Sequence, residues 1–163
     1  MGHDAVEIDF VMPWVDGSDP AWREEFLKYR ALQAPQGEPA CDTGTAAGAV
    51  DASEERYRDW DTLRYWFRGV ERFAPWVNRI HFITWGHLPA WLDTAHPKLH
   101  VVRHADYTPS PYLPTFNSCP IELNMHRIEG LAEHFVYFND DTFLCRPVGP
   151  ERFFLNGLPR DAA

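Results

Sequence analysis

The sequence has few cysteines and few basic residues for its size, and each shortage excludes a class of protein. Only 3 of its 163 residues are Cys, at positions 41, 119 and 145. An odd count without zinc-ligand spacing predicts reduced thiols in a cytosolic chain, although a disulfide between two of them stays open. Lys and Arg total 15 against 24 Asp and Glu, for a net charge of −9. This balance argues against nucleic acid as a partner.

Long apolar runs, targeting signals and common nucleotide motifs are also missing. No stretch is long enough to span a bilayer, and residues 1–10 do not form a signal peptide. We therefore expect a cytoplasmic protein, with peripheral association at the inner face of a membrane left open. There is no GxGxxG, P-loop or HExxH pattern, which disfavours a dinucleotide enzyme, a Walker-type ATPase and a zinc protease.

What the chain does have is material for a core. Hydrophobic residues make up 45% and aromatic residues 15% of it, enough for one compact domain. Apolar runs predict short buried strands at residues 6–15, 79–84, 99–103 and 135–138. Helical periodicity predicts helices at residues 21–32, 59–74 and 118–129, with Asp59 or Asp61 as the cap of the second and Ser118 as the cap of the third. Residues 33–55 are expected to be a flexible loop. This alternation favours an α/β, Rossmann-like, mostly parallel sheet flanked by helices.

Polar residues follow the predicted strands. Ligands of such sheets bind beyond the carboxyl ends of the strands. That rule places on one rim residues 16–19, 85–86, 104–106 and 139–141. Asn139, Asp140 and Asp141 supply two carboxylates and an amide oxygen, which suit magnesium or manganese. An ordinary turn is the alternative interpretation, because Asn and Asp are common there.

Two other stretches carry possible ligand contacts. WVDGSDP, residues 14–20, follows the first strand, where α/β folds place a ligand loop, but it is equally typical of a plain turn. In the predicted helix 118–129, the first turn favours an anion, with Asn117 and Ser118 at its start. His126 suits a general base and Arg127 a phosphate contact. A solvent-facing pair of Glu122 and His126, four residues apart, is the alternative.

Taken together, these stretches resemble the Stealth family. The resemblance to the first signature region of the family lies in IDFVMPWVDGSDPAW, residues 8–22. The resemblance to its second region lies in three stretches: RYRDWDTLRYWFRGVERFAPWVNRIHFITWGHLPAWL, HPKLHVVRHADY and YLPTFNSCPIELNMHRIEGLAEHFVYFNDDTFL. The resemblance implies signature regions at residues 1–32 and 56–146 of a single domain, separated by the 33–55 loop and followed by a C-terminal segment at 147–163. Stealth proteins usually carry two further regions, so it also implies an incomplete domain whose C-terminal part is missing.

The resemblance implies a function. Stealth proteins include bacterial capsular polysaccharide phosphotransferases and the animal N-acetylglucosamine-1-phosphotransferase. The implied reaction is metal-dependent transfer of hexose 1-phosphate, such as N-acetylglucosamine 1-phosphate, from a UDP-sugar to an acceptor hydroxyl of a polysaccharide or other glycan, in capsule or exopolysaccharide synthesis. The alternatives are a glycosyltransferase that uses the same nucleotide-sugar donor and a non-catalytic fragment that binds it.

The resemblance also implies roles for individual residues. Mg²⁺ or Mn²⁺ would be held by Asn139, Asp140 and Asp141. The catalytic residues would be His126, Arg127 and Asp141. The nucleotide and the other substrate groups would contact Trp14, Asp16, Gly17, Asp19, Arg64, Asn117 and Ser118.

Overall fold

A computed structural model describes residues 6–33 and 57–160, which belong to two compact units. The first unit comprises residues Met1–Trp14 and Trp60–Ala163, and the second comprises Val15–Asp59. Most of the loop predicted at residues 33–55 lies outside the described residues, as does Cys41. Cys119 and Cys145 are exposed free thiols.

A four-stranded parallel sheet forms the centre of the first unit. Its strands are β1 (Ile8–Pro13), β2 (Ile80–Thr84), β3 (Leu99–Arg103) and β4 (His134–Tyr137), in the order β3-β2-β1-β4. Every residue of β2 is buried, as are the first five of β1, because both faces of these central strands are covered. The predicted α/β fold with a parallel sheet is thus confirmed.

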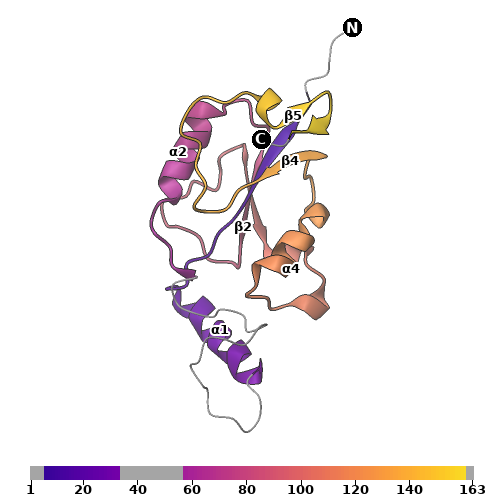
Figure 1. Cartoon of the computed structure of the whole chain (residues 1–163). Helices are drawn as coiled ribbons and strands as arrows, with labels where there is room; N and C mark the ends of the chain where they lie inside the picture. The colour runs from indigo at the N-terminus through magenta and orange to yellow at the C-terminus, as the bar shows by residue number, and fades with distance from the viewer. Residues whose placement is uncertain (1–5, 34–56, 161–163) are drawn as a thin grey trace, which may run out of the picture. The chain divides into compact units, whose positions relative to one another are not determined.

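Helices cover the two faces of this sheet (Figure 1). On one face, α2 (Leu63–Phe73) buries Trp66 and Val70 against Phe10 and Phe82 of the strands. On the other face, α4 (Ser118–Leu123) contributes Ile121 to a second cluster of apolar residues. None of the described helices is long and apolar enough to cross a membrane.

Short elements complete the first unit. They are α3 (His104–Tyr107), the 3-10 turns η2 (Ser110–Tyr112), η3 (Met125–Arg127) and η4 (Pro150–Arg152), and a hairpin of β5 (Phe154–Leu155) and β6 (Leu158–Pro159). Phe153, just before the hairpin, contacts the rings of Phe10 and Trp76. The segment that follows the sheet therefore packs back onto the core.

A buried carboxylate joins three segments of the first unit. Asp9 of β1 is 0% exposed, and its Oδ2 accepts hydrogen bonds from His81 Nε2 at 2.8 Å and the Ala132 amide at 2.9 Å. Its Oδ1 accepts from Asn78 Nδ2 at 2.8 Å. Burial lowers the pKa of His81, so the ring stays neutral near pH 7 and donates one N–H to Asp9. Three donors thus satisfy the carboxylate, whose burial would otherwise be costly.

The predicted helix 118–129 is wrong beyond residue 123. Asn124 turns its side-chain amide back to the Pro120 carbonyl at 2.8 Å, so this carbonyl is satisfied without another helical turn. The chain tightens into η3, becomes extended at Ile128 and turns at Gly130 with a φ of 73°. Glu122 and His126 consequently do not share the face of one continuous helix.

Two predicted helix caps also differ from the structure. The residue before α2 is Thr62, which makes no capping side-chain hydrogen bond, rather than Asp59 or Asp61. Asn117, rather than Ser118, caps α4, because its Oδ1 accepts from the Cys119 amide at 3.0 Å. Sequence composition located the starts of both helices to within a few residues, but it did not identify the residue at the cap position.

The second unit is built around α1 (Pro20–Gln33). Asp19 caps this helix, because its Oδ1 accepts from the Trp22 amide at 2.8 Å. Pro20 suits the first helical position, since it has no N–H to leave unpaired. Trp22 and Phe26 stack at 4.9 Å between ring centroids, and both contact Tyr57.

Candidate functional site

The strand order creates a topological switch point in the first unit. After β1 the chain continues to β2 on one side, and after β3 it crosses to β4 on the other side of β1. In open parallel sheets, ligands bind at the carboxyl ends of strands on the two sides of such a point. The strands here are β1, followed by Trp14, and β4, followed by Phe138 and Asn139. Phe138 prolongs their pairing by donating to Val11 O at 2.9 Å.

Residues Asn139–Asp141, here called the β4 loop, lie at this position. All three are exposed, and the Thr142 amide closes the turn by donating to Asn139 O at 3.0 Å. Thr142 Oγ1 lies 3.4 Å from Asp141 Oδ1. The strand thus delivers two adjacent carboxylates to the carboxyl end of the sheet, and a ligand there stays a prediction.

Tyr137, the last residue of β4, connects this loop to α4. Its hydroxyl lies 2.8 Å from Asn139 Oδ1 and 3.2 Å from Glu122 Oε1. Burial and the nearby carboxylate of Glu122 raise the pKa of Tyr137, so the phenol keeps its proton at neutral pH. A phenol has one proton to donate, and the shorter contact directs it to the Asn139 amide oxygen. Tyr137 therefore fixes the orientation of Asn139.

The chemistry of the β4 loop fits one kind of metal site and not another. Within residues 6–33 and 57–160, no three His, Cys, Asp or Glu side chains gather as a metal-binding group. A site enclosed by protein ligands, such as structural zinc, does not fit this arrangement. Magnesium fits, because it commonly uses one or two carboxylates and takes its other ligands from phosphates and water.

The α4 region presents the other predicted active-site residues on the surface. His126 and Arg127 are both exposed in η3, and Ser118 is exposed at the start of α4. The side-chain oxygen of Asn117 accepts the hydrogen bond that caps α4. Because α4 has only six residues, its dipole is weaker than the predicted longer helix would supply. An anion contact at Asn117 and Ser118 stays a prediction.

Trp14, Thr84 and His104, at the carboxyl ends of β1, β2 and β3, are buried, whereas Gly86 and Asp106 beyond them are exposed. Trp14 is 5% exposed, and its indole packs on Phe82 and His87 at centroid distances of 5.7 and 5.1 Å. Within the described part of the chain, its Nε1 has no hydrogen-bond partner. Thr84 Oγ1 donates to His87 O at 2.6 Å. Trp14 thus serves the core, and the polar edge of its ring is buried as well.

His104 occupies the end of β3 and is also buried. Burial, together with His87, lowers its pKa to about 4, so it is neutral at physiological pH. Among the residues that the structure describes, no group accepts from or donates to its Nδ1. Neighbouring Asp106 accepts from the Arg103 amide at 2.7 Å. In the predicted rim at 104–106, His104 is therefore buried in the fold, whereas residues 105 and 106 are exposed.

Arg64 belongs to the opposite face of the sheet from Asn117. It is exposed in the first turn of α2, and its Cζ lies 5.3 Å from the centroid of the Trp91 ring. Since α2 and α4 cover different faces, the structure does not gather Arg64 and Asn117 on one face. The predicted substrate role of Arg64 rests on the resemblance alone.

The predicted ligand loop at Asp16–Asp19, here called the α1 loop, lies in the second unit. Asp16 Oδ1 accepts from the Ser18 amide at 2.8 Å and from Ser18 Oγ at 2.6 Å. The amide of Gly17 donates to Tyr57 O at 2.7 Å, and that of Asp19 donates to Asp16 O at 3.1 Å. Three successive N–H groups are thus used within the unit, so this loop is not an open cradle for phosphate.

Two features of the site were missed from the sequence. Tyr137 was interpreted only as an apolar strand residue, although a phenol at a strand end next to polar residues is itself a signal. The pocket of the second unit was not foreseen either, because it joins α1 to Tyr57 and Arg58 across residues that carry no periodic pattern. Long-range juxtaposition of this kind cannot be deduced from local sequence.

Comparison with family models places both parts of the chain. A model of Stealth protein conserved region 1 matches residues 6–32, and one of conserved region 2 matches residues 56–161. The chain is 53% identical over 153 residues to a capsular polysaccharide phosphotransferase of Streptococcus pneumoniae, a match covering 94% of this chain and 43% of that protein.

Other relatives have similar names. A receptor polysaccharide phosphotransferase of Streptococcus oralis is 47% identical over 161 residues, covering 94% of this chain and 43% of its own length. An exopolysaccharide phosphotransferase of Streptomyces coelicolor is 48% identical over 155 residues, covering 94% and 24% respectively. The chain therefore spans less than half the length of these curated relatives.

Proposed function

The chain belongs to the Stealth family, and we propose that it forms the donor- and metal-binding part of a sugar-1-phosphate transferase. The donor is a nucleotide sugar such as UDP-N-acetylglucosamine, and the acceptor is a hydroxyl of a capsular or exported polysaccharide. The observation that carries the proposal is the β4 loop, whose exposed oxygen ligands follow β4 at the switch point of the sheet. The names of the relatives support the reaction class.

The proposed reaction is displacement at phosphorus. The acceptor oxygen attacks the sugar-linked phosphorus of the donor, and the bond from this phosphorus to the bridging oxygen of the diphosphate breaks. The sugar 1-phosphate becomes joined to the acceptor as a phosphodiester, and UMP leaves with the bridging oxygen. The acceptor proton passes to a base. Such a reaction depends on positioning and on stabilisation of phosphate charge.

The residues of the first unit supply candidates for these tasks. The β4 loop would hold Mg²⁺ or Mn²⁺, which when bound neutralises charge on the diphosphate. Tyr137 orients Asn139 within that loop. His126 is assigned to take the acceptor proton, and Arg127 to contact the transferred phosphate. Asp141 would be a metal ligand and the second candidate for the base.

The α1 loop is assigned an indirect role in donor binding. Its carboxylates and amides already hydrogen-bond within the second unit. We therefore expect Asp16, Gly17 and Asp19 to act by fixing the shape of the loop rather than by cradling phosphate directly.

The proposed location is the cytoplasm, with association at the inner face of the membrane. No membrane-spanning helix occurs among the described residues, which is compatible with this location.

The products of turnover test this function. Purified chain with UDP-N-acetylglucosamine, MgCl₂ and the polysaccharide should release UMP and form a phosphodiester, detectable by chromatography and phosphorus NMR. Release of UDP with a new glycosidic bond would instead establish a glycosyltransferase. Donor binding detected by calorimetry without any turnover would instead support a non-catalytic chain, which binds the donor but lacks a complete set of catalytic residues.

A further inference from the structure

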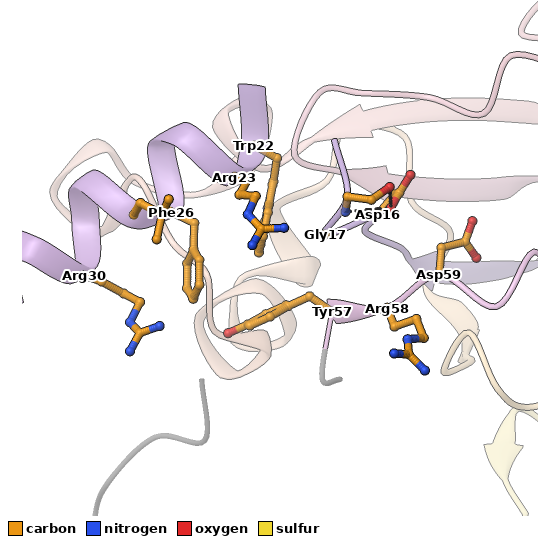
Figure 2. Close-up of a pocket in the computed structure, with 11 residues that line it drawn as sticks. Asp16, Gly17, Trp22, Arg23, Phe26, Arg30, Tyr57, Arg58 and Asp59 are labelled. Atoms are coloured by element: carbon orange, nitrogen blue, oxygen red, sulfur yellow. Dashed lines mark hydrogen bonds between the residues drawn. The ribbon is translucent and has the colours of Figure 1, made fainter. Parts of the chain in front are cut away.

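The second unit contains a pocket that none of the preceding roles explains. It has a volume of about 220 Å³ and lies between α1 and residues 57–59 (Figure 2). Its walls include three aromatic and three arginine side chains, namely Trp22, Phe26, Tyr57, Arg23, Arg30 and Arg58. Every lining residue belongs to the second unit.

Aromatic rings form one wall of this pocket. Trp22 stacks on Phe26 with an interplanar angle of 19°, and Tyr57 contacts these rings at centroid distances of 5.0 and 5.2 Å. Phe26 is only half-buried, so part of its ring remains at the surface of the pocket. Such a wall favours the flat, apolar C–H face of a ring-shaped ligand over an extended polar chain.

Guanidinium groups give the same pocket a positive character within an acidic chain. Arg23, Arg30 and Arg58 line it, against the carboxylates of Asp16 and Asp59. The described residues that line the pocket therefore have an excess of one positive charge, whereas the chain as a whole carries −9. Arg30 lies at the edge of the aromatic wall, with its Cζ 5.8 Å from the Phe26 ring centroid. Guanidinium forks match carboxylate and phosphate geometry with two parallel hydrogen bonds.

The frame of the pocket is fixed by close packing. A Cβ on Gly17 would lie 2.7 Å from both the Cβ and the backbone oxygen of Tyr57, so only glycine fits under this ring. The Gly17 amide is bonded to the same oxygen. Capping by Asp19 fixes the start of α1, from which Trp22, Arg23 and Phe26 project. A pre-formed frame reduces the ordering cost of binding.

We propose that this pocket binds a sugar ring that carries an anionic group. The aromatic wall takes the apolar face of the ring, and Arg30 takes its carboxylate or phosphate. The pocket is smaller than the range of about 300–1,000 Å³ typical of sites that enclose a drug-sized ligand. It therefore suits one charged monosaccharide unit better than a whole nucleotide sugar.

This chemistry has two possible sources. An acidic unit of the acceptor polysaccharide would present a carboxylate on the ring, whereas the donor side would present a sugar phosphate. Titration calorimetry of the full chain, without added divalent metal, distinguishes them with five probes: glucuronic acid, glucose 1-phosphate, UMP, glucose and inorganic phosphate. Omitting metal separates this result from the proposed transfer activity.

The expected result is at least about tenfold tighter binding of a charged sugar than of glucose or inorganic phosphate, because ring and anion both contribute. Tighter binding of glucuronic acid identifies the acceptor as the source. Tighter binding of glucose 1-phosphate or UMP identifies the donor. Three results overturn the proposal. They are equal affinity for glucose and both charged sugars, equal affinity for phosphate and glucose 1-phosphate, and no binding of any charged sugar.

Matched substitutions in α1 test the role of Arg30. Arg30→Ala should weaken binding of the charged sugar about tenfold, and Arg30→Lys should recover part of the loss, since it restores charge but not the fork. The control is Lys28→Ala, which removes the same charge from the same helix. Lys28 is paired with Glu24 at 2.8 Å and does not line the pocket. Equal weakening by Arg30→Ala and Lys28→Ala would show only general electrostatics and overturn the assignment.

Discussion

Two loops of similar composition behave differently in this chain. In the α1 loop, the side-chain oxygens of Asp16 and Asp19 accept hydrogen bonds from nearby amides and so build the turn and the helix start. In the β4 loop, Asp140 and Asp141 remain exposed after an apolar strand, and a neighbouring tyrosine orients Asn139. The side-chain oxygens of the α1 loop therefore build local structure, whereas the ligand role proposed for the β4 loop rests on its exposure at the end of a central sheet.

The largest expected difference between the loops concerns metal-dependent binding. The double substitution Asp140→Asn and Asp141→Asn should reduce magnesium-dependent binding of UDP-N-acetylglucosamine below detection, while the free energy of unfolding changes by no more than about 0.5 kcal/mol. Calorimetry and urea unfolding measure the two quantities.

The matched control is the double substitution Asp16→Asn and Asp19→Asn. It removes the same charge but keeps the accepting oxygens of the α1 loop, so metal-dependent binding should persist. If the β4 variant bound as well as the unaltered chain, the metal assignment would be wrong. If the α1 control lost binding equally, the contrast between the loops would fail.

Acid should affect the unit that carries the β4 loop, because that unit contains buried histidines. The pKa of His104 is lowered from 6.5 to about 4, and that of His81 is also lowered. Below pH 6.5 the unfolded chain therefore binds more protons than the folded chain. The free energy of unfolding consequently decreases as the pH is lowered from 6.5 to about 4. For His104 the loss is on the order of 3 kcal/mol.

Urea unfolding at a series of pH values between 7 and 4 measures this loss. His104→Asn should flatten the curve, since Asn does not titrate. The described residues of the second unit, which hold the α1 loop, include no histidine, so no imidazole there contributes to this slope. An unchanged slope in His104→Asn would show that this residue is not the acid-sensitive group.

A smaller effect should come from the orientation of Asn139. Tyr137→Phe removes the hydroxyl and leaves the packing of the ring nearly intact. Loss of a residue that orients a metal ligand typically costs about 10–100-fold in metal affinity. Manganese binding followed by electron paramagnetic resonance should show a loss in this range, with the free energy of unfolding little changed. Unaltered manganese affinity would mean that Tyr137 does not position the ligand.

The smallest expected effect concerns the α1 loop itself. Asp19→Ala removes the oxygen that caps α1 and should lower the free energy of unfolding by about 1 kcal/mol. Magnesium-dependent binding should be unchanged once the protein is folded. Ser18→Ala, at an exposed neighbouring position, should cost less. A loss of metal binding in Asp19→Ala without loss of stability would reverse the roles assigned to the two loops.

Much of the fold could be predicted from apolar runs alone. The strand expected at residues 99–103 is β3, and the strands expected at 79–84 and 135–138 coincide with β2 and β4 to within one residue. Parallel strands covered on both faces are nearly continuous in hydrophobicity, so their signal is strong. The same logic correctly placed Asn139–Asp141 at a strand end.

The failures come from tertiary contacts that a local pattern does not contain. The periodicity of 118–129 continues through Ile128, which is buried, but Asn124 ends the helix with its own side chain. Likewise, Asp9 and His81 are buried in partnership although they stand 72 residues apart. Trp14 was expected to face a ligand, and its ring instead joins the core. Its direct role in nucleotide binding stays a prediction.

The central position of β1 has a consequence for synthesis on the ribosome. β1 is made before β4, its partner on one side. This pairing joins Ile8 to His134, which lie 126 positions apart. At about 5–20 residues per second, that edge of β1 waits roughly 6 to 25 seconds for β4 to emerge. During this interval a very apolar strand has unpaired backbone groups that invite association with other chains. We expect the nascent chain to engage a chaperone until residue 137 leaves the exit tunnel.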